Sequence, residues 1–232
     1  MMSEQPHVEY KSGRMPQCAY TEGKHETITL GMGCFWGPEA LFGQLPGVQR
    51  TRVGFAGGTA PDPTYRQMGD HSEVVEVDYI PALLPLAELL ELFWNSHNPD
   101  NINGYKGRQY WSMALYRNEA QLAVIKAALQ KRAAEGLNVT GAATEVAPFA
   151  AFYLAEDKHQ KYYLKRYPDA IEKLSKLYPE HDELVHSTLA ARLNGVAKGY
   201  ASRERILADI ASWPIDSASK EAMLAVIRQI RW

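Results

Sequence analysis

Residues 30–38 read LGMGCFWGP, and this stretch decides the fold because a β-like segment passes through glycines into a helix. Pro38 strengthens this interpretation, since proline is favoured in the first turn of a helix. The lone thiol of Cys34 therefore stands at a helix start, beside the large aromatic rings of Phe35 and Trp36. Free backbone N–H groups and the helix dipole favour a thiolate there, so we expect a nucleophile. Without such context, an isolated cysteine is more often a small buried hydrophobic residue.

Strand and helix patterns alternate along the chain on both sides of this stretch. Strands are expected near Thr27–Leu30, Gln49–Phe55, Glu73–Ile80, Ser112–Arg117 and Thr144–Tyr153. Helices are expected after Cys34, over Asn118–Glu135, and where Leu86, Leu89, Leu90, Phe93, Trp94 and His97 recur at helical spacing. The resulting order, β-α-β-β-α-β-α-β, predicts an α+β fold with helices packed on one face of a mixed sheet.

The chain divides into three expected parts. Residues 1–25 contain few large apolar side chains and are interpreted as a flexible N-terminal tail, residues 26–180 as the main domain, and residues 181–232 as a helical C-terminal extension. The extension is expected to hold three short helices, separated by residues 195–199 and by residues 213–214. The last helix carries an apolar stripe, so the extension is expected either to pack on the main domain or to form a small helical appendage. The stripe consists of Met223, Val226, Ile227 and Ile230.

Composition limits the classes of function. The 232 residues contain 25 Lys+Arg against 27 Asp+Glu without a strong charge run, so nothing indicates a nucleic-acid partner. No apolar run is long enough to suggest a membrane span, and the first residues lack the apolar core of a signal peptide. Two cysteines do not make a disulfide framework. We therefore expect a soluble cytoplasmic protein whose cysteines are reduced, catalytic or both, with no cofactor and no membrane partner.

Further motifs follow in a recognisable order. They are GFAGG at 54–58, PTYR at 63–66, HSE at 71–73, FW at 93–94, GRQY at 107–110 and EDKHQ at 156–160. Together with residues 33–38, this series resembles the methionine sulfoxide reductase A family, whose signature Gly-Cys-Phe-Trp-Gly carries the nucleophile. The resemblance covers roughly residues 26–168. It implies a two-layer ferredoxin-like plait with a mixed sheet, which performs thiol-dependent reduction of methionine sulfoxide, free or in proteins, with preference for the S epimer.

Glu73 is the expected proton donor. Because side chains alternate along a strand, Glu73 shares a face with Val75 and Val77, whereas Glu76 and Asp78 lie on the other face. Burial on the apolar face raises the pKa of a carboxyl group, which would allow it to donate a proton near neutral pH. The alternative is that Glu73, as the first residue of its strand, faces water.

The resemblance implies roles for other residues. Cys34 would attack the sulfoxide sulfur, Tyr65 and Tyr110 would donate hydrogen bonds to its oxygen, and Phe35 and Trp36 would wall a slot for the S-methyl group. Outside this context a tyrosine is more often a packing residue. Alternatives are a reductase of other small sulfoxides, or a module without turnover that binds oxidised methionine or senses peroxide.

The segment before Ser112 departs from the family pattern. Tyr105 stands where the family has an aspartate, and Trp111 replaces an arginine, so substrate preference and efficiency are in doubt. No cysteine follows Cys34, which leaves Cys18 as the candidate resolving thiol; the alternative is direct reduction of a Cys34 sulfenic acid by thioredoxin or another external thiol.

The histidines do not suggest a metal site. His71, His97 and His159 lack the short paired spacing of a metal site, so each is interpreted as a structural hydrogen-bonding residue. His159 with Gln160 is expected to anchor a helix end near the site.

Overall fold

A computed structural model describes residues 15–20, 25–102, 104, 107–137 and 144–232. Within these residues six strands form one sheet in the order β5-β4-β1-β3-β2-β6. The strands are β1 (Glu26–Met32), β2 (Val48–Ala56), β3 (Ser72–Tyr79), β4 (Ser112–Tyr116), β5 (Glu145–Pro148) and β6 (Phe152–Leu154). Every neighbouring pair is antiparallel except β4 with β5, which is parallel. The predicted α+β class with a mixed sheet is therefore confirmed.

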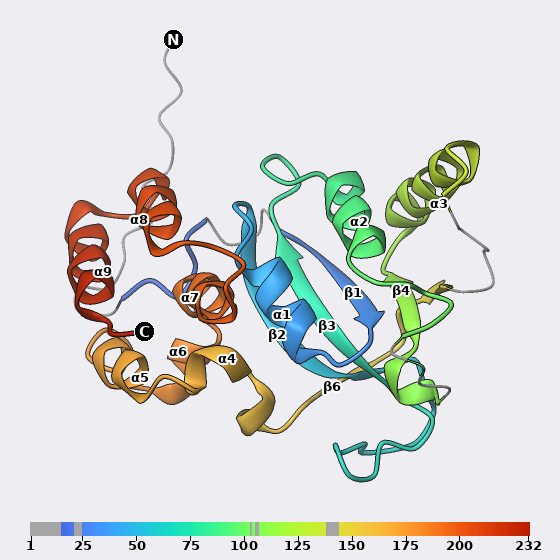
Figure 1. Ribbon diagram of the computed structural model, residues 1–232, viewed down its shortest axis with the longest axis horizontal. Coiled ribbons are helices and arrows are strands. Elements are labelled where there is room, and N and C mark those ends of the chain that lie inside the picture. The colour runs from blue at the N-terminus through green and yellow to red at the C-terminus, as the bar shows by residue number, and fades with distance from the viewer. Residues whose placement is uncertain (1–14, 21–24, 103, 105–106, 138–143) are drawn as a thin grey trace.

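Two helices cover one face of the sheet (Figure 1). They are α1 (Trp36–Gly43) and α2 (Leu86–Asn95). The predicted apolar stripe of α2 is buried from Leu86 to Trp94 and packs with Val75 and Val77 of β3. A third helix, α3 (Glu119–Ala134), begins where the Asn118 side chain accepts a hydrogen bond from the Gln121 N–H. Side-chain periodicity thus fixes which surface of α2 faces the sheet.

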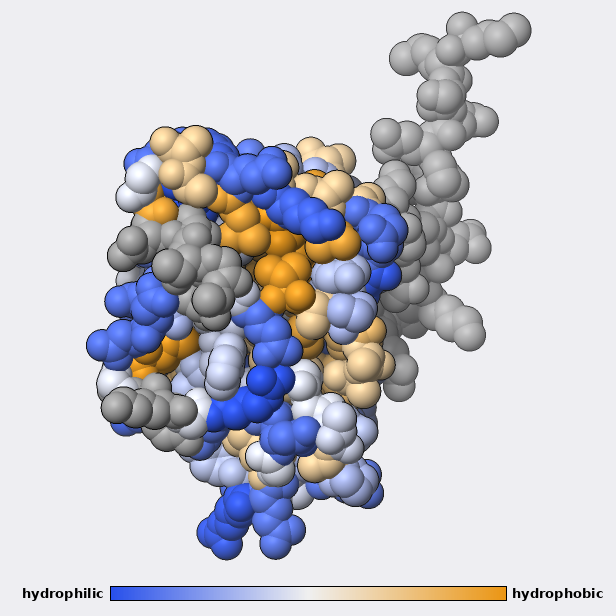
Figure 2. Space-filling model, turned by 90° about the vertical axis from the view of Figure 1, so that its right-hand side faces the viewer, coloured by the Kyte–Doolittle hydropathy of each residue, from blue (hydrophilic) through white to orange (hydrophobic). Residues whose placement is uncertain are grey.

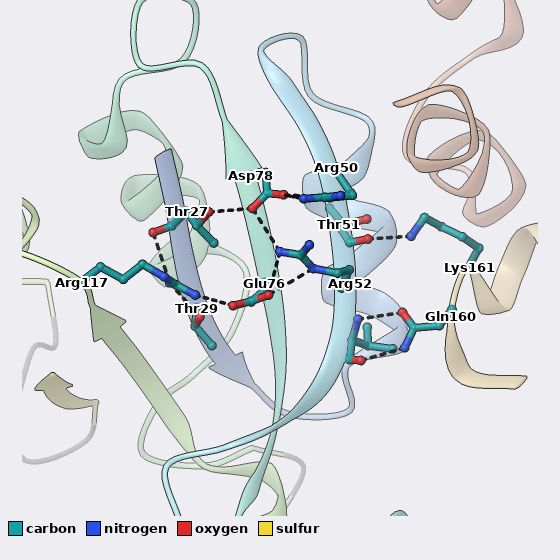
Figure 3. A network of polar contacts seen from close by, with 11 residues as sticks. Thr27, Thr29, Arg50, Thr51, Arg52, Glu76, Asp78, Arg117, Gln160 and Lys161 are labelled. Atoms are coloured by element: carbon teal, nitrogen blue, oxygen red, sulfur yellow. Dashed lines mark hydrogen bonds and ion pairs between the residues drawn. The ribbon is translucent and has the colours of Figure 1, made fainter. Parts of the chain in front are cut away.

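The opposite face of the sheet carries a charged network (Figure 3). Arg50 of β2 pairs with Asp78 of β3 at 2.7 Å, and Arg52 pairs with Glu76 at 2.8 Å. Arg117 also pairs with Glu76. Its guanidinium donates to the Thr27 carbonyl as well, which links the network to β1. The predicted alternation along β3 is confirmed, since Val75 and Val77 pack with α2 and the paired carboxylates of Glu76 and Asp78 lie on the other face.

One predicted strand was wrong. The apolar run near Thr144–Tyr153 forms two strands, β5 and β6, which lie at opposite edges of the sheet. After Pro148 the main chain leaves β5, with the Phe149 N–H still donating to Tyr116, and crosses to pair with β2. Proline cannot donate a ladder hydrogen bond, so it marks the end of the first strand.

The C-terminal part forms a helical layer beside α1 (Figure 1). Its helices are α4 (Tyr162–Lys165), α5 (Pro168–Leu174), α6 (His181–Val185), α7 (Thr188–Lys198), α8 (Arg203–Ser212) and α9 (Ser217–Gln229). Their shared hydrophobic cluster runs from Leu164 to Ile230 and includes Met223 and Ile227 of the predicted stripe. The division of the chain at residues 180 and 181 stays a prediction, although this cluster already begins at Leu164.

Residues 195–199 do not separate two helices as predicted. Helix α7 runs through Gly195 and ends at Gly199, whose φ of 87° places it in the left-handed region. A Cβ at Gly195 would lie 2.3 Å from Cβ of Gln44, and a Cβ at Gly43 would lie 2.7 Å from the carbonyl oxygen of Ala191. These glycines therefore permit close packing of α7 on α1, and the sequence alone did not reveal that contact.

The described part of the predicted tail is bound to the protein. Ala19 is buried in the C-terminal cluster, its N–H donates to Thr188 Oγ1 at 3.0 Å, and the Thr188 N–H donates to the Gln17 carbonyl. Residues 15–20 thus differ from the expected flexible tail because these bonds and apolar contacts hold them. The rest of the predicted tail lies outside the described residues, except residue 25.

A groove of about 390 Å³ lies between α2 and α3. Apolar side chains line it, among them Trp94, Val124 and Ala128, and hydrophobic colours gather in the upper part of Figure 2. It contains none of the predicted site residues. In the described part of the chain, no helix combines the length and the apolar character that crossing a bilayer requires.

Candidate active site

Cys34 lies in the turn between β1 and α1, as the sequence predicts. Gly33 precedes it with a φ of 94°, which only glycine adopts readily, and Phe35 is the N-cap of the helix. The first backbone N–H groups of α1 consequently have no partner within the helix. One of them, the Trp36 N–H, donates to the Cys34 sulfur. The thiol is half-buried and remains accessible.

Glu73 is fully buried at the start of β3, next to this helix start. Its Oε2 accepts a hydrogen bond from the Phe35 N–H at 3.1 Å, and its Oε1 accepts one from Gln109 Nε2 at 2.7 Å. Burial is the main cause that raises the pKa of Glu73, against the two hydrogen bonds that lower it. The predicted rise in pKa is confirmed, and the alternative in which Glu73 faces water is excluded.

The expected thiolate character of Cys34 needs correction. Burial and the negative charge of Glu73 raise the pKa of Cys34, and the Trp36 N–H that lowers it only partly compensates. The helix start acts in the predicted direction, but it is outweighed because the same site also desolvates the sulfur and faces it with a carboxylate. Protonation of Glu73 removes that charge, so the thiol and the carboxyl group titrate as a coupled pair.

Two tyrosines approach the pair from different segments. Tyr65 lies at the tip of the loop between β2 and β3, where Thr64 and Gln67 exchange backbone hydrogen bonds. Tyr110 closes the short 3₁₀ turn Arg108–Tyr110 and shares a hydrogen bond with Tyr65. Burial and the charges of Glu73 and Cys34 raise the pKa of Tyr65, so its phenol stays protonated and able to donate. The structure thus brings together all four predicted reacting groups.

Aromatic rings form one wall of the site. The Trp36 ring stacks on Tyr162 at 3.9 Å with an interplanar angle of 4°, and its Nε1 donates to His159 Nδ1 at 3.3 Å. Phe35 is fully buried behind this wall, with its ring 6.4 Å from that of Tyr65, whereas Trp36 and Tyr65 are half-buried. The methyl slot itself stays a prediction, in which Trp36 offers surface and Phe35 supports it.

The segment after β6 binds both β2 and the start of α1: Gln160 binds β2, whereas His159 contacts Trp36, the first residue of α1. Gln160 accepts from the Val53 N–H at 3.0 Å and donates to the Val53 carbonyl at 2.8 Å, which mimics a neighbouring strand (Figure 3). Lys161 follows with its ammonium 2.6 Å from Glu39 of α1, and both side chains are almost fully buried. This ion pair and the Gln160 bonds fix His159 against Trp36.

The other two predicted structural histidines make hydrogen bonds. His71 Nδ1 accepts from the Gly58 N–H at 3.2 Å, and its Nε2 contacts the Ala60 carbonyl oxygen at 2.8 Å. His97 Nδ1 lies 2.8 Å from the Phe93 carbonyl oxygen. His71 thus closes the loop that carries Tyr65, and His97 closes the end of α2.

Sequence reasoning missed three contributors to the site. Gln109 binds Glu73, Tyr162 stacks on Trp36, and Arg108 holds the surrounding loops. Arg108 and Gln109 belong to the GRQY motif at 107–110, which was the available signal, although it gave neither residue a role. Of the two departures from the family pattern, Trp111 is 40% exposed beside Arg108, and Tyr105 lies outside the described residues.

Cys18 lies away from this site. Its neighbour Ala19 is bound to Thr188, whose hydroxyl donates to the Gln49 carbonyl near the start of β2. Phe55, whose ring is 6.0 Å from that of Phe35, lies at the other end of the same strand. Six residues of strand span roughly 20 Å. A disulfide requires Cα atoms within about 7 Å, so residues 15–20 would have to detach before Cys18 could reach Cys34.

The model of the peptide methionine sulfoxide reductase family matches residues 26–192. The chain belongs to this family. The peptide methionine sulfoxide reductase of Drosophila melanogaster is 44% identical over 187 residues, which are 79% of this chain and 72% of that protein. Peptide methionine sulfoxide reductase A5 of Oryza sativa subsp. japonica is 42% identical over 175 residues, covering 74% of this chain and 68% of that protein.

Solved structures of family members have a similar fold. Methionine sulfoxide reductase A of Corynebacterium diphtheriae is 36% identical, with a TM-score of 0.53 over 64% of this chain and 77% of that one. Reduced Mxr1 of Saccharomyces cerevisiae is 26% identical, with a TM-score of 0.55 over 73% of this chain and 94% of that one. The family match ends inside α7, so α8 and α9 lie beyond the matched residues.

Proposed function

We propose that this protein reduces methionine sulfoxide, free or in proteins, to methionine at the expense of thiols, with Cys34 as the nucleophile. One observation carries the proposal: Cys34 and Glu73 both accept hydrogen bonds from backbone N–H groups at the start of α1. The Trp36 N–H donates to the Cys34 sulfur while the adjacent Phe35 N–H donates to the Glu73 carboxylate. A nucleophile and a buried acid therefore face the same small volume.

The reaction transfers one oxygen atom to the thiol. The Cys34 sulfur forms a bond to the sulfoxide sulfur while Glu73 protonates the sulfoxide oxygen, and the proton released from the Cys34 thiol returns to the Glu73 carboxylate. Transfer of the resulting hydroxyl group to the Cys34 sulfur then breaks the bond between the two sulfurs and releases the thioether. Thiol and sulfoxide thus become sulfenic acid and methionine, with the cysteine oxidised and the substrate reduced by two electrons. The raised pKa of Glu73 keeps the carboxyl proton available near neutral pH.

The two tyrosines would stabilise the developing charge. Tyr65 and Tyr110 share a hydrogen bond, so either phenol can donate to the sulfoxide oxygen while the other supports it. Trp36 offers the accessible aromatic surface for the S-methyl group. Preference for the S epimer is part of this proposal, since a site with one wall and one set of donors accepts one arrangement around the sulfur.

An external thiol would return Cys34 to its reduced form. One thiol condenses with the sulfenic acid, forming a mixed disulfide and water, and a second thiol releases Cys34. The position of Cys18 among the C-terminal helices supports this route over an internal disulfide. A dithiol protein such as thioredoxin supplies both thiols in one molecule and is the proposed partner, in the cytoplasm.

We also propose that the catalytic unit is a two-layer ferredoxin-like plait. The strands β4-β1-β3-β2, with α1 and α2 as the two crossovers, follow the order of a ferredoxin-like plait. Strands β5 and β6 extend this unit at its two edges.

The test is turnover with a dithiol and each epimer of a methionine sulfoxide peptide. We expect many cycles with the S epimer, at one dithiol oxidised per methionine formed, and no turnover after Cys34→Ser. Cys18→Ser is the matched control and should retain the wild-type rate. Conversion that stops after one equivalent of substrate, or full activity in Cys34→Ser, would contradict the proposed function.

A further inference from the structure

Arg108 contacts several separate segments of the chain although its side chain is 30% exposed. Its Nε donates to the Asp70 carbonyl at 2.7 Å, and its Nη2 donates to the Gly57 carbonyl at 2.7 Å. The guanidinium also pairs with Glu145 of β5 at 2.9 Å and lies 5.3 Å from the centre of the Trp111 ring. One planar cation thus joins three separate segments, which suits the fixed fork of donors that arginine provides.

Two of these contacts close the neck of the loop that carries Tyr65. The loop leaves β2 just before Gly57 and returns to β3 just after Asp70, so Arg108 binds one carbonyl on each side of its neck. The Asp70 carboxylate also accepts hydrogen bonds from the Thr59 and Ala60 N–H groups at 2.8 to 2.9 Å. Closure of the neck restricts where the tip of the loop can lie.

Arg108 also begins the turn that carries the second tyrosine. Its own carbonyl accepts a hydrogen bond from Ser72 Oγ at 2.6 Å, directly beside Glu73. The next two residues are Gln109, which binds Glu73 at 2.7 Å, and Tyr110, which binds Tyr65. A shift of Arg108 would therefore be felt by the acid and by both phenols.

We propose that Arg108 is a positioning residue that holds the Tyr65 loop and the turn with Gln109 and Tyr110 in one fixed arrangement around Glu73. This inference rests on the proposed function. Two phenols and one carboxyl group must reach the same oxygen, and misplacement by about 1 Å can cost about 100-fold in rate. Arg108 touches none of the reacting atoms, so it acts only through the groups that it places.

The test compares Arg108→Gln with Arg50→Gln. Arg50 is a matched control, because its side chain is also 30% exposed and also pairs with a carboxylate, but on the far face of the sheet. Limited trypsin digestion reports the loop neck, since Arg66 is exposed next to Tyr65. We expect cleavage after Arg66 to become about tenfold faster in Arg108→Gln, as expected for loss of hydrogen bonds to a charged group, and unchanged in Arg50→Gln.

The pH profile gives a second readout that a general loss of stability would not move. Loss of the Gln109 hydrogen bond raises the pKa of Glu73, because that bond favours the ionised form. Since the proposed acid acts in its protonated form, the alkaline limb of kcat should shift to higher pH while kcat falls about 10- to 100-fold.

Unchanged cleavage after Arg66, or an alkaline limb that stays in place, overturns the proposal. If Arg108→Gln does not fold, Glu145→Gln takes its place, because it removes the anchor of the guanidinium and must change both readouts in the same directions. The digestion does not depend on turnover. Inactivity of the wild-type protein would therefore refute the proposed function, whereas cleavage after Arg66 would still decide whether Arg108 holds the loop.

Discussion

Replacement of Glu73 by glutamine should change turnover and thiol reactivity in opposite directions. The amide keeps the size of the carboxyl group, and its oxygen can still accept from the Phe35 N–H. If the Gln109 side-chain amide flips by 180°, its oxygen can accept a hydrogen bond from the new NH₂ group at position 73. Both hydrogen-bond partners of the original carboxylate then stay satisfied. We therefore expect a loss of stability of about 1 kcal/mol, or roughly 2–4 °C in Tm.

Turnover should nevertheless fall steeply. The amide cannot donate the catalytic proton, and general acid catalysis contributes about 10²- to 10⁴-fold, or about 3–5 kcal/mol of barrier. Cys34 should at the same time become more reactive toward iodoacetamide at mildly alkaline pH. The negative charge of Glu73 raises the pKa of Cys34, so its removal lowers that pKa and increases the thiolate fraction, by up to about tenfold per unit.

The assays are steady-state reduction of the sulfoxide and the pH dependence of alkylation. In the wild-type protein, kcat should fall as pH rises through the raised pKa of Glu73, because the acid is then deprotonated. Glu76→Gln is the control, since Glu76 lies on the same strand but faces the arginines of the other side. Turnover within tenfold of wild type in Glu73→Gln, or slower alkylation of Cys34, would refute this reasoning.

Three further substitutions test other parts of the structure. Tyr110→Phe should lower kcat about 10- to 100-fold with little change in Tm, because one donor to the oxygen is lost, and steady-state kinetics would show this. Lys161→Met should cost about 3–5 kcal/mol in urea denaturation, since it leaves the buried Glu39 carboxylate without its cationic partner; a cost below 1 kcal/mol would argue against the pair. Gly195→Ala should cost about 1–3 kcal/mol, since the new Cβ would meet Gln44, and a thermal melt equal to wild type would contradict the close packing of α7 on α1.

The elements that sequence predicted well are those with a local physical signal. The stripe of α2 follows the helical period, and β3 alternates between apolar and charged residues, so both were assigned to the correct surfaces. Cys34 and Glu73 were found because a helix start and a buried strand position each act on one side chain. These effects extend over only a few residues, and a sequence displays them directly.

The features that were missed depend on contacts between distant segments. Gly195 looks like a helix breaker until α1 is seen lying against it, and the run near Thr144–Tyr153 looks like one strand until its halves pair at opposite edges. The pKa of Cys34 could not be predicted from the helix start alone, since burial and Glu73 outweigh it. The hydrogen bonds from Arg108 to the Gly57 and Asp70 carbonyls likewise could not be predicted, because they depend on where these residues lie in space.

Single turnover without a reductant tests whether Cys34 takes the oxygen of the sulfoxide and becomes a sulfenic acid. The protein is mixed with excess methionine sulfoxide peptide and then treated with dimedone, and the modified residue is identified by mass spectrometry. We expect one equivalent of reduced peptide per protein chain and a dimedone adduct on Cys34. Absence of reduced peptide, or an adduct on Cys18 with Cys34 unmodified, would contradict it.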